Sequence, residues 1–184
     1  VVFISGRGSN AKNIINYFSD NSDFQVSHVF SNNKYSDFVN YIKSTNVQYF
    51  IFEEAEISGK VFRELKKINP KLIILAGFLK KIPPSYINFF KNKIINIHPS
   101  LLPKYGGAGM YGLNIHKKVI ENEEVETGIS IHYVTEEYDS GKIIFQKKIK
   151  VAKYDTPEKL EEKIHKLEYE YFPKVIESLL INYE

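Results

Sequence analysis

The chain has 184 residues, of which 43% are hydrophobic and 14% aromatic, enough to build one sizeable core. We therefore expect a single domain over residues 1–184. The 25 basic and 22 acidic residues give a net charge of +3 and are interspersed, so we expect no nucleic-acid partner. The sequence has no cysteine, which excludes disulfides and thiolate chemistry and favours a reducing compartment, the cytoplasm. No apolar run approaches the ~20 residues of a membrane-spanning helix, so we expect no membrane partner.

The first half of the chain alternates short β-branched or aromatic runs with segments of helical period. The runs predict strands at residues 1–5, 25–30, 47–52, 72–76 and 94–97. The segments between them predict helices at residues 11–19, 36–43, 60–68 and 83–90, the last of which opens with prolines that suit a first helical turn. This alternation is typical of parallel strands joined by crossover helices.

The pattern changes after about residue 113. We expect a helix at residues 113–122, then strands at 128–134 and 142–151 on either side of a turn-prone segment, which predicts an antiparallel addition to the sheet. Apolar residues at helical spacing from 156 to 181 predict a final helix that is kinked or broken at Pro173. The predicted fold is α/β: a Rossmann-like open twisted sheet, mostly parallel with an antiparallel late strand pair, and helices on both faces.

A glycine-rich turn, SGRGSN at residues 5–10, joins the first strand to the first helix. Flexible backbone and several amide donors at a helix N-terminus make a natural anion site, so a phosphate fits here. The alternative is a tight turn in which Ser9 or Asn10 only caps the helix. The spacing matches neither the dinucleotide fingerprint nor the nucleotide P-loop, and the local sequence leaves both interpretations open.

Two polar side chains, Asn96 and His98, share one face of the fifth predicted strand where that strand ends. Ligands bind outside the carboxyl ends of strands in open α/β sheets, whereas an isolated histidine is more often a surface or capping residue. Asp139 lies in the late turn, and His132 lies near the end of the strand before it. Asn96, His98 and Asp139 supply a neutral donor, a titratable donor and a carboxylate, which suits oxyanion stabilisation and proton transfer. A nearby carboxylate would favour the protonated form of His98.

Other chemistries lack the residues they need. Ser100 has no Gly-x-Ser-x-Gly elbow, which argues against a serine hydrolase. The five histidines are scattered without a His-Glu-x-x-His pair, so we expect no metal. His116 and His165 lie in predicted helices among charged residues and are expected on the surface, and Lys60 is expected to be a solvated helix lysine.

Four segments carry a family resemblance over nearly the whole chain: NIHPSLLPKY, ISGRGSN, LAGFLKKIPPSY and HYVTEEYDSG. They resemble the phosphoribosylglycinamide formyltransferases. The resemblance implies transfer of the formyl group of 10-formyltetrahydrofolate, the co-substrate, to the amino group of glycinamide ribonucleotide in de novo purine biosynthesis. NIHPSLLP with a downstream aspartate is shared with methionyl-tRNA formyltransferase and formyltetrahydrofolate hydrolase, so it specifies the chemistry more than the acceptor. GRGSN points to glycinamide ribonucleotide.

Carried over position by position, the resemblance implies three groups of site residues. The catalytic group is Asn96, His98 and Asp139. The ribonucleotide group is Gly8, Ser9 and Asn10 at the phosphate, with Glu168 at the glycinamide and ribose. The folate group is Leu79, Lys80, Lys81 and Ile82 on one side and Thr135, Glu136, Glu137 and Tyr138 on the other. Many members carry arginine where this chain has Lys80, and the loop at residues 104–112 is longer and richer in glycine than in many members.

Two alternatives stand beside the transferase. A hydrolase of 10-formyltetrahydrofolate would replace the amine by water at the same centre and would need no phosphate site. A non-catalytic nucleotide- or phosphate-binding module would keep the fold without the chemistry. Glu168 follows apolar Leu167 in the closing helix, so we expect it to face away from the side that packs against the sheet. The sequence carries no prediction of the oligomeric state.

Overall fold

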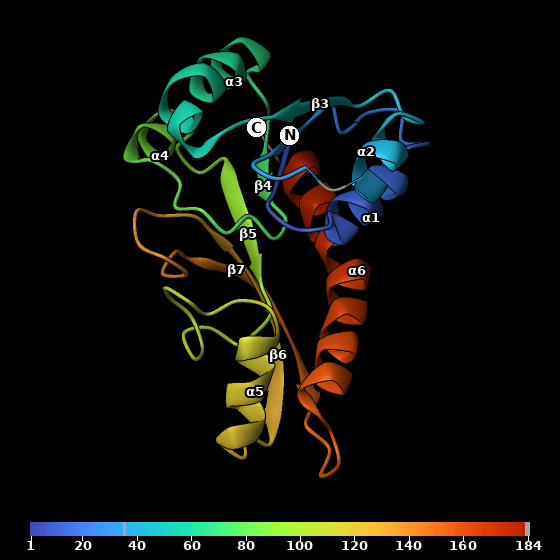
Figure 1. Cartoon of the computed structure of the whole chain (residues 1–184), viewed down its shortest axis with the longest axis vertical. Coiled ribbons are helices and arrows are strands. Elements are labelled where there is room, and N and C mark those ends of the chain that lie inside the picture. Colours follow the sequence, from blue (N-terminus) through green and yellow to red (C-terminus); the bar gives the residue numbers. More distant parts are fainter. Residues whose placement is uncertain (35, 183–184) are drawn as a thin grey trace.

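The computed structural model describes residues 1–34 and 36–182, through which one seven-stranded sheet runs (Figure 1). Its strand order is β3-β2-β1-β4-β5-β6-β7; the first five strands are parallel, and β6 is antiparallel to both of its neighbours. The predicted sheet, mostly parallel with an antiparallel late pair, is confirmed. The strands are β1 (Val2–Ile4), β2 (His28–Ser31), β3 (Gln48–Ile51), β4 (Ile73–Leu75), β5 (Ile94–His98), β6 (Glu126–Tyr133) and β7 (Ile143–Lys150).

Helices cover both faces of the sheet, as the alternating sequence predicts. On one face α1, α2 and α6 pack against the strands, and on the other face α3 and α4 do so, while α5 packs beside α6 near the antiparallel strands (Figure 1). The helices are α1 (Ser9–Tyr17), α2 (Ser36–Ile42), α3 (Phe62–Ile68), α4 (Pro84–Phe89), α5 (Leu113–Glu121) and α6 (Pro157–Ile181).

Strand β1 shows how the two cores arise. Val2 and Ile4 belong to the core beneath α1 and α6, whereas Phe3 belongs to the core beneath α3 and α4 and stacks on Phe30 with ring centroids 5.1 Å apart. Both faces of β1 are buried, which is why the strand is apolar without interruption. The two cores hold the central strands in place on both faces. Because β1, β4 and β5 are parallel neighbours, their carboxyl ends lie at one edge of the sheet.

Two helices differ from the prediction. A 3-10 turn (Glu54–Glu56) and a π-helical turn (Ile57–Val61) precede α3, so Lys60 lies in the π-helical turn and not in the first turn of α3. Helix α6 continues through Pro173, so of the two predicted outcomes, a kink or a break, the break is wrong. Phe172 and Ile176, on either side of that proline, are both buried in the same core, and their packing holds the two parts of α6 on the sheet despite the missing N–H group.

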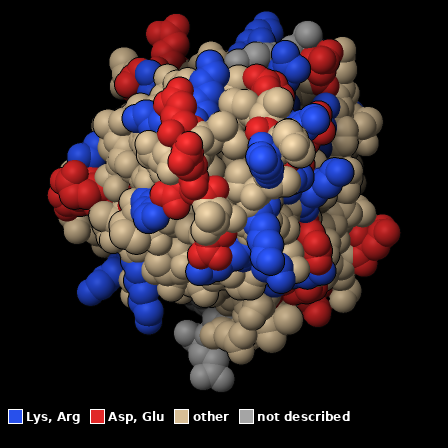
Figure 2. Space-filling model, turned by 90° about the horizontal axis from the view of Figure 1, so that it is seen from below, with Lys and Arg blue, Asp and Glu red and all other residues tan. Residues whose placement is uncertain are grey.

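No helix in residues 1–34 and 36–182 is long and apolar enough to cross a bilayer. Viewed from below the orientation of Figure 1, acidic and basic side chains are mixed across the surface (Figure 2), which agrees with their interspersed order in the sequence.

Substitution of Gly141 tests the packing of the turn between β6 and β7, which contains Asp139. A Cβ atom at position 141 would overlap the main-chain carbonyl of Tyr133, which no side-chain rotation relieves. We expect Gly141→Ala to lower the free energy of unfolding by about 1–3 kcal/mol. Gly59→Ala is the matched control, because a Cβ there meets nothing within 4 Å, and its effect should stay within about 0.5 kcal/mol. Urea unfolding of both variants checks this, and equal stabilities would contradict the packing described here.

Candidate active site

A cavity of about 420 Å³ lies where the carboxyl ends of β1, β4 and β5 meet. It is lined by the turn that opens α1, the segment after β4, the end of β5 with its following loop and α5, and the segment after β6 with one side of α6. The structure brings every residue of the three predicted groups into this lining: Gly8, Ser9, Asn10, Leu79, Lys80, Lys81, Ile82, Asn96, His98, Thr135, Glu136, Glu137, Tyr138, Asp139 and Glu168.

Strand β5 delivers Asn96 and His98 to the cavity by simple alternation. Ile95 and Ile97 point into the core beneath α1 and α6, so the two polar side chains point to the opposite face of the sheet. The antiparallel register then sets His132 of β6 directly across from Asn96. His98 and His132 are only 4% and 2% exposed, so their polar atoms need partners inside the protein.

The partners of His132 define which of its nitrogens carries hydrogen. Its Nδ1 lies 2.8 Å from the carbonyl oxygen of Tyr133, an atom that only accepts, so Nδ1 donates. Its Nε2 lies 3.2 Å from Nδ2 of Asn96 and accepts from that amide. One amide hydrogen of Asn96 is therefore used within the protein, and the second is free to donate to a bound molecule.

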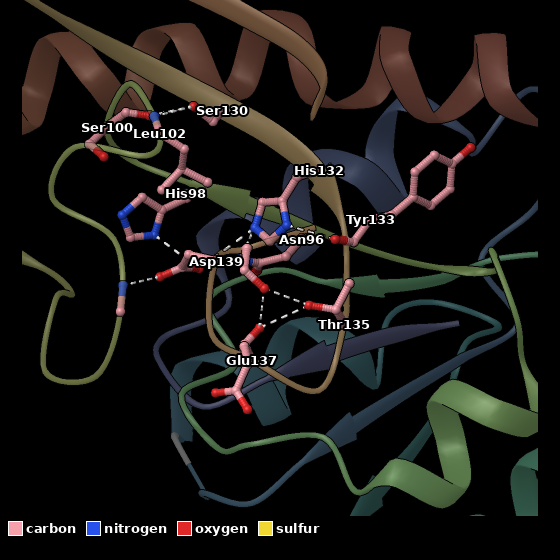
Figure 3. Close-up of polar contacts among 12 residues, drawn as sticks. Asn96, His98, Ser100, Leu102, Ser130, His132, Tyr133, Thr135, Glu137 and Asp139 are labelled. Atoms are coloured by element: carbon pink, nitrogen blue, oxygen red, sulfur yellow. Dashed lines mark hydrogen bonds and ion pairs between the residues drawn. The ribbon is translucent and has the colours of Figure 1, made fainter. Parts of the chain in front are cut away.

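Asp139 lies between the two histidine rings (Figure 3). Its Oδ1 is 3.5 Å from Nδ1 of His98 and 3.6 Å from Nε2 of His132, while Oδ2 accepts from the main-chain N–H of Gly107 at 2.9 Å. Nε2 of His98 donates to the carbonyl oxygen of Tyr105 at 2.7 Å, which leaves Nδ1 without hydrogen in the neutral ring. The lone pair of His98 Nδ1 and a carboxylate oxygen of Asp139 thus converge, and together they can accept a proton.

Burial governs the charges of this cluster. It lowers the pKa of His98, and the carboxylate of Asp139 and the Tyr105 carbonyl raise that pKa by less. Asp139 thus acts in the expected direction, toward the protonated ring, but burial outweighs it. Burial would raise the pKa of Asp139, but His132, His98 and the Gly107 N–H together hold it below its usual value. Burial thus favours the neutral form of His98, while the surrounding donors favour the ionised form of Asp139.

The glycine-rich turn is shaped by Gly8, which caps α1 in the left-handed conformation with φ 74°. A Cβ at this position would run into the ring of Phe38, so only glycine fits. Neither Ser9 nor Asn10 caps the helix with its side chain, so the capping alternative is wrong. Asn10 instead donates from Nδ2 to Glu168 Oε2 at 2.9 Å, and its own Oδ1 is buried without a protein partner.

Glu168 is 5% exposed and lies in the cavity wall on α6. Burial raises its pKa, and the hydrogen bond from Asn10 offsets only part of that rise. The prediction that Glu168 faces away from the packed side of the helix is wrong: it lies on the same buried face of α6 as Ile164 and Phe172, which are four residues before and after it. A buried carboxylate at one end of the cavity is suited to binding an amine or hydroxyl group of a ligand.

The prediction that His116 is a surface residue is wrong. It is 1% exposed, lines the cavity with half-buried His165, and its Nδ1 has no partner within the protein. Burial, with smaller effects of His165 and His98, lowers its pKa to about 4. The signal was present in the sequence: His116 adjoins Ile115 and lies three residues before Val119, both on the buried face of α5.

The two segments predicted to bind folate, residues 79–82 and 135–138, carry exposed lysine and glutamate side chains that form ion pairs. Lys80 lies 2.7 Å from Glu54, and Lys81 lies 3.9 Å from Glu137, which links the segment after β4 to the segment after β6. Lys60 is exposed, pairs with Glu56 at 3.1 Å and does not line the cavity, so its assignment as a solvated lysine is confirmed. Within the described part of the chain, no three His, Asp or Glu side chains are grouped to hold a metal ion.

An open α/β sheet with a polar cavity at the carboxyl ends of its strands is the arrangement in which enzymes of this class bind ligands. The family described as formyl transferase matches residues 1–176 of this chain. The chain therefore belongs to the formyl transferase family, and the predicted family is confirmed.

Relatives named phosphoribosylglycinamide formyltransferase are similar over almost the whole chain. The Arabidopsis thaliana chloroplastic relative is 34% identical over 97% of this chain and 64% of its own length; that from Bacillus subtilis is 33% identical over 97% and 93%. The chain spans less than two thirds of the length of two plant relatives: 64% of the one from Arabidopsis thaliana and 59% of the one from Vigna unguiculata. The crystal structure of the enzyme from Anaplasma phagocytophilum is 33% identical, with a TM-score of 0.85 over 95% of this chain and 82% of its own.

The lowered pKa of His116 predicts a stability change with pH. The ring titrates near 6.5 in the unfolded chain and near 4 in the folded protein, so the unfolded state binds the proton more tightly. The stability associated with the neutral ring is complete above pH 6.5 and is lost as the pH falls from 6.5 to 4, by at most roughly 3 kcal/mol.

Unfolding free energies of the wild type and His116→Gln between pH 7.5 and 4 measure this loss. As the pH falls across that range, the free energy of unfolding of the wild type should decrease more than that of the variant. Glu168, whose raised pKa acts in the opposite direction, is present in both proteins and cancels in the comparison. Parallel pH profiles would show that the ring of His116 is not held neutral by burial.

Proposed function

We propose that this chain transfers the formyl group of 10-formyltetrahydrofolate to the amino group of glycinamide ribonucleotide, giving formylglycinamide ribonucleotide and tetrahydrofolate in de novo purine biosynthesis. We treat residues 1–184 as one formyltransferase domain. The observation that carries the proposal is that Asn96, His98 and Asp139 lie in the same cavity as the glycine-rich turn and buried Glu168. The names of the relatives support the same reaction.

In this proposal the ribonucleotide phosphate binds at Gly8, Ser9 and Asn10. The left-handed Gly8 opens α1, and the first amides of a helix point out of its N-terminus, where they favour an anion. Glu168 then binds the glycinamide and ribose portion, and its hydrogen bond with Asn10 ties the two parts of the subsite together. The unpartnered Oδ1 of Asn10 is an acceptor available to the same ligand.

The folate lies against residues 79–82 and 135–138. Leu79 and Tyr138 are 47% and 42% exposed, so each segment offers apolar surface to a flat aromatic ring. Ile82 is buried beneath this surface. Lys80 and Lys81 are paired with Glu54 and Glu137, and both ion pairs are exposed enough to exchange for a ligand carboxylate.

The reaction begins with attack of the neutral amine on the formyl carbon, which forms the new N–C bond and moves the carbonyl electron pair onto oxygen. The free amide hydrogen of Asn96 stabilises that oxyanion. The proton released by the attacking nitrogen is accepted by the pair His98 and Asp139, and the resulting imidazolium donates to the oxyanion. Collapse then breaks the bond to N10 of the folate, which takes up the proton. No covalent enzyme intermediate forms.

The alternatives are less well supported. The crystal structure of a formyltetrahydrofolate deformylase from Pseudomonas syringae has the same fold, with a TM-score of 0.82, at only 22% sequence identity. A hydrolase binds no ribonucleotide and needs no buried carboxylate hydrogen-bonded to the glycine-rich turn, so the pair Asn10 and Glu168 favours the transferase. A non-catalytic module does not need a carboxylate between two buried imidazoles.

The cysteine-free composition supports a reducing compartment, which we take to be the cytoplasm.

The transferase reaction predicts that tetrahydrofolate release depends on glycinamide ribonucleotide. Absorbance after mixing with 10-formyltetrahydrofolate, with and without the ribonucleotide, measures this dependence. Glu168→Gln should raise the KM for the ribonucleotide by roughly 10- to 150-fold, the effect of losing ~1.5–3 kcal/mol of charged hydrogen bonding, and leave the KM for folate unchanged. Glu170→Gln is the matched control, because Glu170 is an exposed residue of the same helix. Equal release without ribonucleotide would establish the hydrolase instead.

A further inference from the structure

The loop between β5 and α5 is tied to the polar cluster by main-chain atoms. The Tyr105 carbonyl accepts from His98 Nε2 at 2.7 Å, and the Gly107 N–H donates to Asp139 Oδ2 at 2.9 Å. In Figure 3 this loop passes beside the ring of His98, and the dashed line from Asp139 reaches its main chain. The loop therefore contacts the ring nitrogen of His98 that Asp139 does not face.

Tyr105 is held in place by its own side chain. Its hydroxyl donates to Glu124 Oε1 at 2.9 Å and accepts from Asn122 Nδ2 at 2.8 Å, both beyond the end of α5. Its ring packs on the small core that contains Ile115 and Val119. Its backbone has φ 56°, a left-handed conformation that is uncommon for a bulky residue and persists only where surrounding contacts fix it.

This anchor has a chemical consequence at His98. Because a carbonyl only accepts, the Tyr105 oxygen selects the ring form with hydrogen on Nε2 and leaves the lone pair of Nδ1 toward Asp139. The opposite form would place hydrogen on Nδ1 and leave no acceptor there for the proton of the attacking amine. The charged or titratable groups that act on His98 are Asp139, His132 and, at longer range, His116.

We propose that Tyr105 is a positioning residue: through the bonds of its hydroxyl to Glu124 and Asn122, it holds its carbonyl against His98 and fixes the ring as the Nε2–H tautomer. The kinetic part of this inference rests on the proposed function, but the tautomer itself does not. Tyr105 touches no reacting atom, and its influence passes entirely through His98.

Nitrogen-15 NMR of histidine-labelled protein reads the tautomer directly, with the His98 signals assigned from their loss in His98→Asn. In the wild type, His98 should carry hydrogen on Nε2 only. Tyr105→Phe keeps the ring and its apolar contacts but removes the hydroxyl, so both tautomers should appear. The same variant should lose roughly tenfold in kcat while both KM values stay within about twofold, as expected for an impaired proton-transfer group in an intact binding site.

Two further variants separate the anchor from general damage. Glu124→Ala removes the acceptor of the Tyr105 hydroxyl and should give the same mixed tautomers and lowered kcat as Tyr105→Phe. If Tyr105→Phe does not fold, Glu124→Ala provides the test. Lys104→Met removes the other partner of Glu124, an exposed ion pair at 2.8 Å, and should change neither tautomer nor kcat.

Hydrogen on Nδ1 of His98 in the wild type would overturn the proposal. So would a folded Tyr105→Phe with a lowered melting temperature but an unchanged tautomer and kcat, because that is the signature of a purely structural role. If the wild type transfers no formyl group yet Tyr105→Phe mixes the tautomers, the positioning role stands and the proposed function fails.

Discussion

The structure depends on burying a carboxylate between two imidazole rings at the end of β5. His98 and His132 are almost inaccessible, and each nitrogen must find a partner from the protein or from a ligand. The antiparallel pairing of β6 with β5 supplies His132, the turn before β7 supplies Asp139, and the loop after β5 supplies the Tyr105 carbonyl and the Gly107 N–H. The departure from parallel pairing after β5 is what brings these groups together.

The first and last helices of the chain line the same cavity as this cluster. Helix α1 begins at the glycine-rich turn, and helix α6 packs beside it on the same face of the sheet (Figure 1). Asn10 of α1 donates a hydrogen bond to Glu168 of α6. A cavity that joins an anion-binding turn, a buried carboxylate and a proton-accepting cluster can hold two substrates side by side. Holding two reactants in line supplies much of the rate of a direct group transfer, and the side chains then need only stabilise the oxyanion and move one proton.

Much of this arrangement could be predicted from local patterns. Alternation along β5 sets Asn96 opposite the apolar core, and the resemblance to formyltransferases led to Glu168, which follows buried Ile164 by four residues. The burial of His116 had a local signal in its spacing from Ile115 and Val119, which the charged neighbours outweighed in our prediction. The lowered pKa of His98 could not be predicted in this way, because it depends on how the loop at 104–107 and β6 enclose the ring. The continuation of α6 past Pro173 has a related cause: the packing of Phe172 and Ile176 outweighs the local preference of proline to end a helix.

The measurement that tests the central claim most directly is the turnover of Asp139→Asn together with its melting temperature. Asparagine keeps the shape and tolerates the left-handed backbone at this position, φ 53°, but it removes the charge that faces both rings. We predict a loss of roughly 10²-fold or more in formyl transfer, with the fold and the binding of both substrates retained. Near-normal turnover in a folded Asp139→Asn would show that the proton does not pass through this cluster.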